Sequence, residues 1–133
     1  MEQKIKFFQK GDVMKRILIV DDEKKIRKIY SRLLIGEGFE VIEKSNAMEA
    51  SEVLIRENID LVLLDINMPE VDGGVLYEIM QLFHKKTKVI VTSVYPLDEQ
   101  RHLIAEAVDY YDKSQSMEAL MVKVKEALRN GEA

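Results

Sequence analysis

The fold of this 133-residue chain is indicated most clearly by residues 59–65, IDLVLLD, and by the loop NMPEVDGG at residues 67–74. An apolar run that is rich in Leu and Val and bounded by turn residues is typical of a strand buried on both faces of a parallel sheet. Asp65 stands at the carboxyl end of this run, and open α/β sheets bind their ligands at that edge. We therefore predict a buried parallel strand with Asp65 at its functional end.

From about residue 16 onward, apolar runs alternate with amphipathic segments. The other strand candidates are residues 16–20, 39–42, 88–91 and 107–111. Apolar residues at helical spacing follow the first, third and fifth strand candidates, and the clearest stripe consists of Ile26, Ile29, Tyr30, Leu33 and Leu34. Five strands that alternate with five helices predict a single α/β domain, doubly wound, in which helices cover both faces of a parallel sheet.

Two helices carry further signals. Asn46 with Glu49 three residues later resembles a capping box and predicts the start of the second helix. The segment after Pro96 is the weakest helix candidate, because residues 98–102, DEQRH, are all polar. We expect this segment to have low burial and low local stability, and therefore to be able to move.

Composition limits the function classes. The chain is 47% hydrophobic and 33% charged, as soluble globular domains are, and its length suits one domain. It has no cysteine, which excludes disulfides, zinc–thiolate sites and cysteine nucleophiles. No apolar run is long enough for a transmembrane helix, the N-terminus is too charged for a secretory signal, and the net charge of -4 argues against direct nucleic-acid binding. We expect a cytoplasmic protein that binds neither nucleic acid nor membrane.

Polar residues follow three other strand candidates. Asp21-Asp22 comes after the first strand, Thr92 after the fourth and Lys113 after the fifth. Acidic residues at a helix start can also be simple caps, but carboxylates crowded at one sheet edge repel one another unless a cation relieves them. Mg²⁺ suits such oxygen ligands, one carboxylate could act as a nucleophile, and a lysine could neutralise phosphoryl charge. The pattern therefore predicts a magnesium-assisted phosphoryl site.

Four motifs together resemble the receiver domain of two-component response regulators. They are ILIVDDE at 17–23, LDINMPEVDG at 64–73, VIVTS at 89–93 and DYYDK at 109–113, and the likeness covers about residues 15–130. The resemblance implies a flavodoxin-like, chemotaxis-receiver-like fold with strand order 2-1-3-4-5. Residues 14–133 would form the receiver domain. Residues 1–13 would be an N-terminal extension of uncertain origin.

The resemblance also implies how the acidic residues act. Asp65 would accept a phosphoryl group from a histidine kinase or a phosphohistidine carrier, that is, a histidine phosphotransfer protein. Asp22 and Asp65 would bind Mg²⁺ directly, with the main-chain carbonyl of Asn67 as the third protein ligand. Asp21 would act largely through metal-bound water. The chain would catalyse only its own phosphorylation and slow dephosphorylation, and in that sense it would not be an enzyme.

The remaining implied roles concern the switch. Thr92 would move to donate a hydrogen bond to the phosphoryl group, and Lys113 would pair with that group. Tyr110 matches the aromatic position that turns inward when the hydroxyl moves, and before that movement it would be a strand-end tyrosine with a solvated hydroxyl. The surface that changes would comprise residues 96–106, the last strand and the last helix.

Two positions depart from the family pattern. Ser114 stands where receivers usually have a proline after the lysine, and a cis bond before a non-proline residue costs about 2.5–4 kcal/mol. We therefore predict that the Lys113–Ser114 bond is either trans or strained. Ser93 stands where the family has a small residue, often alanine. Either Thr92 or Ser93 could therefore supply the hydroxyl, and the spacing to Lys113 favours Thr92.

Two alternatives remain open at this point. A haloacid-dehalogenase-type phosphohydrolase also uses an aspartate nucleophile and Mg²⁺, but it needs a second aspartate two residues later, where this chain has Asn67. A degenerate receiver would serve only as an interaction module. The output also stays open, because the sequence ends directly after the last helix. The receiver could act alone on a downstream protein or belong with a missing effector domain.

Overall fold

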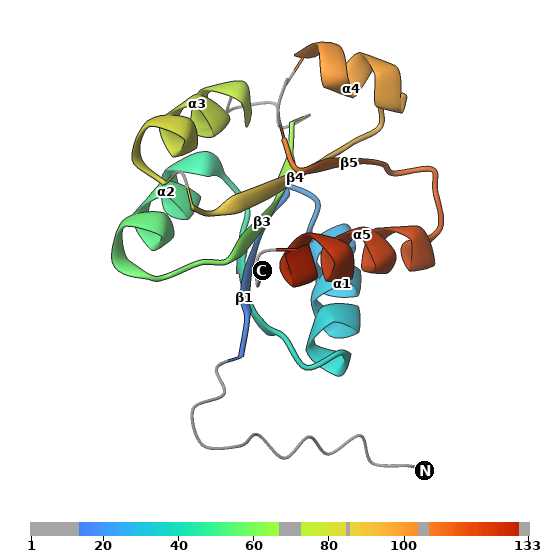
Figure 1. Cartoon of the computed structure of the whole chain (residues 1–133), viewed down its shortest axis with the longest axis horizontal. Coiled ribbons are helices and arrows are strands. Elements are labelled where there is room, and N and C mark those ends of the chain that lie inside the picture. The colour runs from blue at the N-terminus through green and yellow to red at the C-terminus, as the bar shows by residue number, and fades with distance from the viewer. Residues whose placement is uncertain (1–13, 67–72, 85, 104–106, 131–133) are drawn as a thin grey trace.

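A computed structural model of the chain describes residues 14–66, 73–84, 86–103 and 107–130. Figure 1 shows a central sheet with helices on both faces. The sheet has five parallel strands in the order β2-β1-β3-β4-β5. The doubly wound class and the strand order implied by the resemblance are thus confirmed.

The strands are β1 (Arg16–Val20), β2 (Glu40–Lys44), β3 (Leu61–Asp65), β4 (Lys88–Ser93) and β5 (Asp109–Asp112). The helices are α1 (Lys24–Gly36), α2 (Ala47–Arg56), α3 (Gly73–Phe83), α4 (Leu97–Leu103) and α5 (Met117–Asn130). Within the described ranges, every helix is too short or too polar to cross a lipid bilayer.

The core has two layers because successive side chains of a strand point to opposite faces. One layer joins Leu64 and Val91 of the sheet to buried residues of α2 and α3. The other joins Leu63 and Ile90 to buried residues of α1 and α5. In Figure 1, α2 and α3 accordingly lie on one side of the sheet, and α1 and α5 lie on the other. All five residues of β3 are buried, as the apolar run at 59–64 predicts.

Local signals explain several element ends. The side chain of Asn46 accepts a hydrogen bond of 2.9 Å from the backbone N–H of Glu49, so Asn46 caps α2 as predicted. At the end of α1, Gly38 has a φ of 98°, which a residue without a Cβ adopts at little cost. The next residue, Phe39, donates its N–H to the carbonyl of Leu34 at 3.2 Å. This turn leads the chain directly into β2.

The observed limits of β1 are the expected ones, and the limits of the other strands differ from the expected ones by at most two residues. β2 begins at Glu40 and runs to Lys44, whereas the expected strand covered residues 39–42. β4 continues to Ser93, and β5 begins at Asp109. The hydrophobic pattern ends β2 and β4 two residues too early, because main-chain pairing continues where the side chains become polar, as in the pairing of Lys44 with Val20.

The expectation of low burial in α4 is wrong at one position. Gln100 is fully buried, and its side-chain amide donates hydrogen bonds to two main-chain carbonyls. Leu97 also packs against the core. Buried hydrogen bonds of Gln100 therefore hold α4 against its neighbouring segments, and the sequence of the helix does not reveal them.

Candidate functional site

The register of the sheet brings the predicted acidic residues together. Asp21 directly follows β1, and Asp65 is the last residue of β3. These two strands are neighbours, with Val20 paired to Leu64. One carboxylate oxygen from each of Asp21, Asp22 and Asp65 lies within 4.8 Å of the others. The structure therefore forms the acid cluster that the sequence predicts.

Strand alternation decides between the two candidate hydroxyl residues. Asp65 is paired with Thr92 across β3 and β4. Both share the face of Leu63 and Ile90, because residues two apart on a strand point the same way. Ser93 points to the opposite face, and its hydroxyl accepts a hydrogen bond of 3.0 Å from the N–H of Tyr95. The geometry thus places Thr92 rather than Ser93 on the side of Asp65.

Lys113 supplies the positive charge of the site. Its Nζ lies 3.0 Å from Oδ2 of Asp21, 3.3 Å from Oδ2 of Asp65 and 3.7 Å from a carboxylate oxygen of Glu23. Its main-chain N–H donates to the carbonyl of Ser93 at 2.8 Å, which fixes it to the end of β4. Burial by itself lowers the pKa of Lys113, but Asp65 and Asp21 outweigh burial and raise that pKa above its usual value. The lysine is therefore a firmly charged ammonium group held between two carboxylates.

The three carboxylates differ in access to solvent. Asp21 and Asp65 are each 1% exposed, whereas Asp22 is exposed. Oδ1 of Asp21 accepts a hydrogen bond of 2.9 Å from the N–H of Glu23, and its Oδ2 faces Lys113. Both oxygens of Asp21 therefore have partners from the chain itself. Asp22 keeps an open carboxylate at the mouth of the site.

The donor atoms of this cluster fit Mg²⁺. This ion prefers oxygen ligands and typically binds through one or two carboxylates while it keeps several waters. Asp22 and Asp65 offer such carboxylates at suitable mutual distance. Asn67, the other predicted ligand, lies outside the described residues. The cluster can thus hold a hard divalent cation beside a buried carboxylate and a lysine, an arrangement suited to phosphoryl chemistry.

Sequence reasoning treated Tyr30 only as a core residue, but it lies close to the charged cluster. Its ring is 1% exposed and packs edge-on against the ring of Tyr111 at a centroid distance of 6.5 Å. Burial raises the pKa of Tyr30, and Tyr111, Asp21 and Asp65 raise it further. Tyr30 is therefore an uncharged, buried neighbour of the acids, and Tyr111 packs against it. Only the three-dimensional packing reveals this role, since Tyr30 follows the ordinary helical stripe.

Arg27 is a second residue whose role the sequence did not reveal. Its Nη1 donates a hydrogen bond of 2.7 Å to the main-chain carbonyl of Asp21. Its Nε lies 3.4 Å from a carboxylate oxygen of Glu43 on β2. Arg27 thereby fastens the turn that carries the acid pair. A basic residue on α1 shortly after two acids is the signal that could have indicated it.

Tyr110 differs from its expected state. The residue is 6% exposed and packs in the core layer of α2 and α3. Its hydroxyl accepts a hydrogen bond of 3.2 Å from the N–H of Ala107. The expectation of a strand-end tyrosine with a solvated hydroxyl is therefore wrong, because the ring points inward on the face opposite to Tyr111.

The turn after Lys113 is stabilised by hydrogen bonds, although Ser114 stands where receivers usually have a proline. The described residues contain no cis peptide bond, so the Lys113–Ser114 bond is trans, which was one of the two predicted alternatives. Ser114 donates its N–H at 2.9 Å and its hydroxyl at 2.8 Å to Oδ1 of Asp112. Such side-chain bonds stabilise tight turns. Asp112 thus takes over the restraint of the turn.

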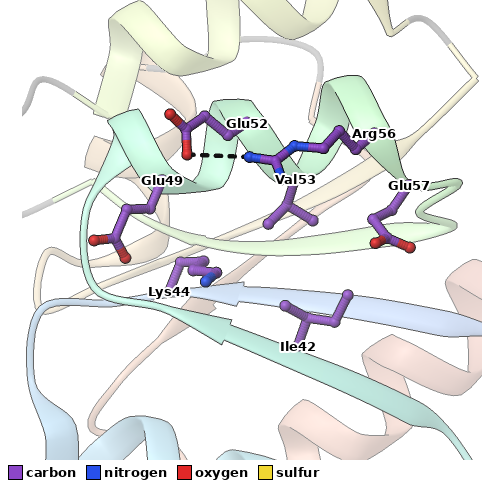
Figure 2. Close-up of a pocket in the computed structure, with 7 residues that line it drawn as sticks. All are labelled: Ile42, Lys44, Glu49, Glu52, Val53, Arg56 and Glu57. Atoms are coloured by element: carbon purple, nitrogen blue, oxygen red, sulfur yellow. Dashed lines mark hydrogen bonds and ion pairs between the residues drawn. The ribbon is translucent and has the colours of Figure 1, made fainter.

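A separate pocket of about 240 Å³ lies between the edge strand β2 and helix α2, away from the acid cluster (Figure 2). Apolar side chains of Ile42 and Val53 line it together with charged residues of both signs. Two of these charges pair with each other, since Arg56 lies 3.5 Å from Glu52. Its three glutamates, Glu49, Glu52 and Glu57, are not among the acidic residues whose carboxylate oxygens come together in the described part of the chain.

Comparison with known proteins agrees with this geometry. The family model described as the response regulator receiver domain matches residues 17–125. The transcriptional regulatory protein SrrA of Staphylococcus aureus is 36% identical over 116 residues, which make up 85% of this chain and 47% of SrrA. The chain therefore spans about half the length of this curated relative.

Solved structures give the same result. A CheY-like receiver domain protein from Methanospirillum hungatei is 32% identical, with a TM-score of 0.84 over 90% of this chain and 98% of that one. The response regulator TrrA from Thermotoga maritima, solved with Mg²⁺ and beryllofluoride, is 36% identical, with a TM-score of 0.79 over 86% of this chain and 100% of that one. With the acid cluster, the fold and the family match in agreement, the chain belongs to the response regulator receiver domains, the phospho-accepting modules of two-component signalling.

Proposed function

We propose that Asp65 is the residue that accepts the phosphoryl group. The observation that carries this proposal is its position: Asp65 is 1% exposed and its Oδ2 lies 3.3 Å from Nζ of Lys113. It is also the residue of the cluster that is paired in the sheet with Thr92. A buried carboxylate between a cation-binding group and a fixed lysine is a suitable nucleophile for a charged phosphoryl group.

The transfer exchanges one bond to phosphorus for another. A carboxylate oxygen of Asp65 attacks the phosphorus of a phosphohistidine, a P–O bond forms and the P–N bond breaks. The imidazole nitrogen keeps the electron pair of the broken bond. Hydrolysis later replaces the aspartyl oxygen by a water oxygen and releases inorganic phosphate, which restores the carboxylate.

The neighbouring side chains have separate roles in this proposal. Lys113 moves from its present pairing with Asp21 and Asp65 to include the new phosphoryl oxygens. The Thr92 hydroxyl donates to one of these oxygens, and Tyr110 keeps the inward position that it already has. Asp22 and Asp65 would hold Mg²⁺ directly together with the main-chain carbonyl of Asn67, and Asp21 would act through a bound water. When bound, the ion neutralises negative charge on the transferred group.

The comparisons support this assignment by analogy. The TrrA structure contains Mg²⁺ with beryllofluoride, which is an analogue of a phosphoryl group. TrrA shares 36% of its sequence with this chain. The described cluster of Asp21, Asp22 and Asp65 offers the same kind of oxygen donors.

The donor in this proposal is a histidine kinase or a histidine phosphotransfer protein in the cytoplasm. The output is contact with a downstream protein or with an effector domain. SrrA, a transcriptional regulatory protein, is about twice as long as the part that matches this chain. Apart from phosphorylation and dephosphorylation of Asp65, we assign the chain no catalysed reaction.

Intact-protein mass spectrometry after incubation with acetyl phosphate tests the proposal. One phosphoryl adduct should form in the presence of Mg²⁺ and should be absent after chelation of Mg²⁺. The adduct should also be absent from Asp65→Asn. Asp60→Asn is the matched control, because Asp60 lies just before β3, at the opposite end of the strand from Asp65, and its variant should form the adduct. An adduct on Asp65→Asn, or none on the wild type, would refute the assignment.

A further inference from the structure

Gln100 is a buried polar residue outside the acid cluster. Its side chain has no exposed surface. Its Nε2 donates one hydrogen bond of 2.8 Å to the carbonyl of Tyr95 and another of 3.0 Å to the carbonyl of Tyr111. Both amide hydrogens are therefore used, and both acceptors belong to other parts of the chain than α4.

The orientation of this amide follows from its partners. Two carbonyl oxygens can only accept hydrogen bonds, so the nitrogen and not the oxygen of the amide must face them. Oε1 then points elsewhere, and it is buried with no hydrogen-bond partner in the part of the chain that the structure describes. A buried acceptor without a partner is unfavourable. The side chain is thus held by its donors while its acceptor remains unsatisfied.

The two acceptors connect Gln100 to the site. Tyr95 lies in the loop that starts directly after β4, three residues beyond Thr92. Tyr111 is the residue of β5 that is paired with Thr92 in the sheet, and it precedes Lys113 by two residues. One amide group in α4 therefore ties together both segments that flank the proposed phosphoryl-binding hydroxyl.

We propose that Gln100 is a positioning residue that holds the loop after Thr92 against β5 and thereby opposes phosphorylation of Asp65. This inference rests on the function proposed above. Movement of Thr92 towards a phosphoryl group carries the following loop with it, and this movement lengthens the bond between Nε2 of Gln100 and the carbonyl of Tyr95. In the described arrangement the ring of Tyr110 already points inward, so the step that the bonds of Gln100 oppose is the movement of the loop after Thr92 alone.

Linkage gives the direction of the effect. A group that stabilises one of two states lowers the affinity of any ligand that prefers the other state. Loss of the hydrogen bonds of Gln100 should therefore raise the affinity for a phosphoryl analogue. By the same argument, binding of the analogue should weaken the hydrogen bonds of the Gln100 side-chain amide in the wild type.

Gln100→Met tests the proposal, because methionine has a similar length and no hydrogen-bonding amide. Beryllofluoride should be titrated by isothermal calorimetry at saturating Mg²⁺. We expect Kd to fall about tenfold in Gln100→Met, which corresponds to about 1.4 kcal/mol. Gln81→Met is the matched control, because Gln81 is exposed on α3 and its variant should keep the wild-type Kd.

A measurement on the wild type covers the case in which Gln100→Met does not fold. The two side-chain amide protons of Gln100 should be protected from hydrogen exchange in the free protein and should lose that protection with beryllofluoride bound. A purely structural role would lower the melting temperature of Gln100→Met but leave Kd unchanged.

An unchanged or higher Kd in a folded Gln100→Met protein would overturn the inference, and so would protection of the amide protons that persists in the bound state. If the wild type does not bind beryllofluoride, that result would instead contradict the proposed function of Asp65. It would also contradict the inference about Gln100, which depends on that function.

Discussion

Replacement of Lys113 by methionine tests the electrostatic description of the site most directly. Lys113→Met keeps a side chain of similar length but removes the ammonium group between Asp21 and Asp65, which are each 1% exposed. At Nζ–O distances of 3.0 and 3.3 Å and an effective dielectric constant of about 20, each attraction amounts to about 5 kcal/mol before desolvation is subtracted.

The expected net effect is smaller than this sum. Burial of the lysine side chain, which is 10% exposed, offsets much of the attraction. Removal of one partner from a buried pair usually lowers stability by about 3–5 kcal/mol. We expect Lys113→Met to lose about 3 kcal/mol of unfolding free energy in the presence of a chelator.

Mg²⁺ should restore part of this loss. A ligand that binds only the folded state adds about 2.7 kcal/mol at a hundredfold excess over its Kd. Without the ammonium group, the carboxylates should bind Mg²⁺ more tightly than in the wild type. Urea denaturation with and without Mg²⁺ should therefore show a smaller difference between wild type and variant when the ion is present.

Lys123→Met is the matched control for this experiment. Nζ of Lys123 lies 3.3 Å from Asp109, but the two side chains are 20% and 31% exposed. Partly exposed pairs contribute less than about 1 kcal/mol, and this pair is not part of the acid cluster. Equal losses for Lys113→Met and Lys123→Met in chelator, or a difference from wild type that Mg²⁺ leaves unchanged, would refute the reasoning.

The remaining predictions concern the hydroxyl, the alkaline limit and a helix cap. Thr92→Val keeps the branched shape and should slow phosphorylation by acetyl phosphate about tenfold, as expected for one lost hydrogen bond. Ser93→Ala should be phosphorylated at close to the wild-type rate. A larger loss of rate in Ser93→Ala than in Thr92→Val would contradict the assignment of the two side chains to opposite faces of β4. The pKa values of Lys113 and Tyr30 are raised in the folded state. Both side chains should therefore stabilise the fold fully below about pH 10, and this stabilisation should be lost as the pH rises through their folded-state pKa values. Urea midpoints measured across this range should fall less steeply for Tyr30→Phe, and an identical slope would exclude this contribution. Asn46→Ala removes the cap of α2 and should cost about 1 kcal/mol of unfolding free energy, and an unchanged thermal midpoint would show that the cap is unimportant.

The parts of the fold that depend on hydrophobic pattern could be predicted from the sequence. The apolar run before Asp65 predicts a buried central strand, and all of β3 is buried. The acid cluster was also predictable, because the carboxyl ends of parallel strands meet at one edge and bring Asp21 and Asp65 together. The order of the strands did not follow from periodicity. It came from the resemblance of the four motifs to receiver domains.

The buried polar contacts could not be predicted. Gln100 stands in a run of polar residues, and such a run usually faces solvent; its burial depends on carbonyl groups of a loop and of β5. Tyr110 and Tyr111 are adjacent in sequence but enter different core layers. Which of the two layers each ring joins depends on the register of β5 against β4. Such contacts join segments far apart in the chain, and a local pattern contains no information about them.

The placement of Lys113 has a consequence for the order in which the working site arises during synthesis. Asp21 and Lys113 are 92 positions apart (113 − 21), yet their side chains are in direct contact. A ribosome that has released only the first four strands therefore exposes a nascent chain whose acids lack their lysine. Translation proceeds at about 5–20 residues per second, so this stage lasts for seconds. A chain interrupted before β5 could gather the carboxylates, but it would lack the lysine that pairs with Asp21 and Asp65 until its last strand was made.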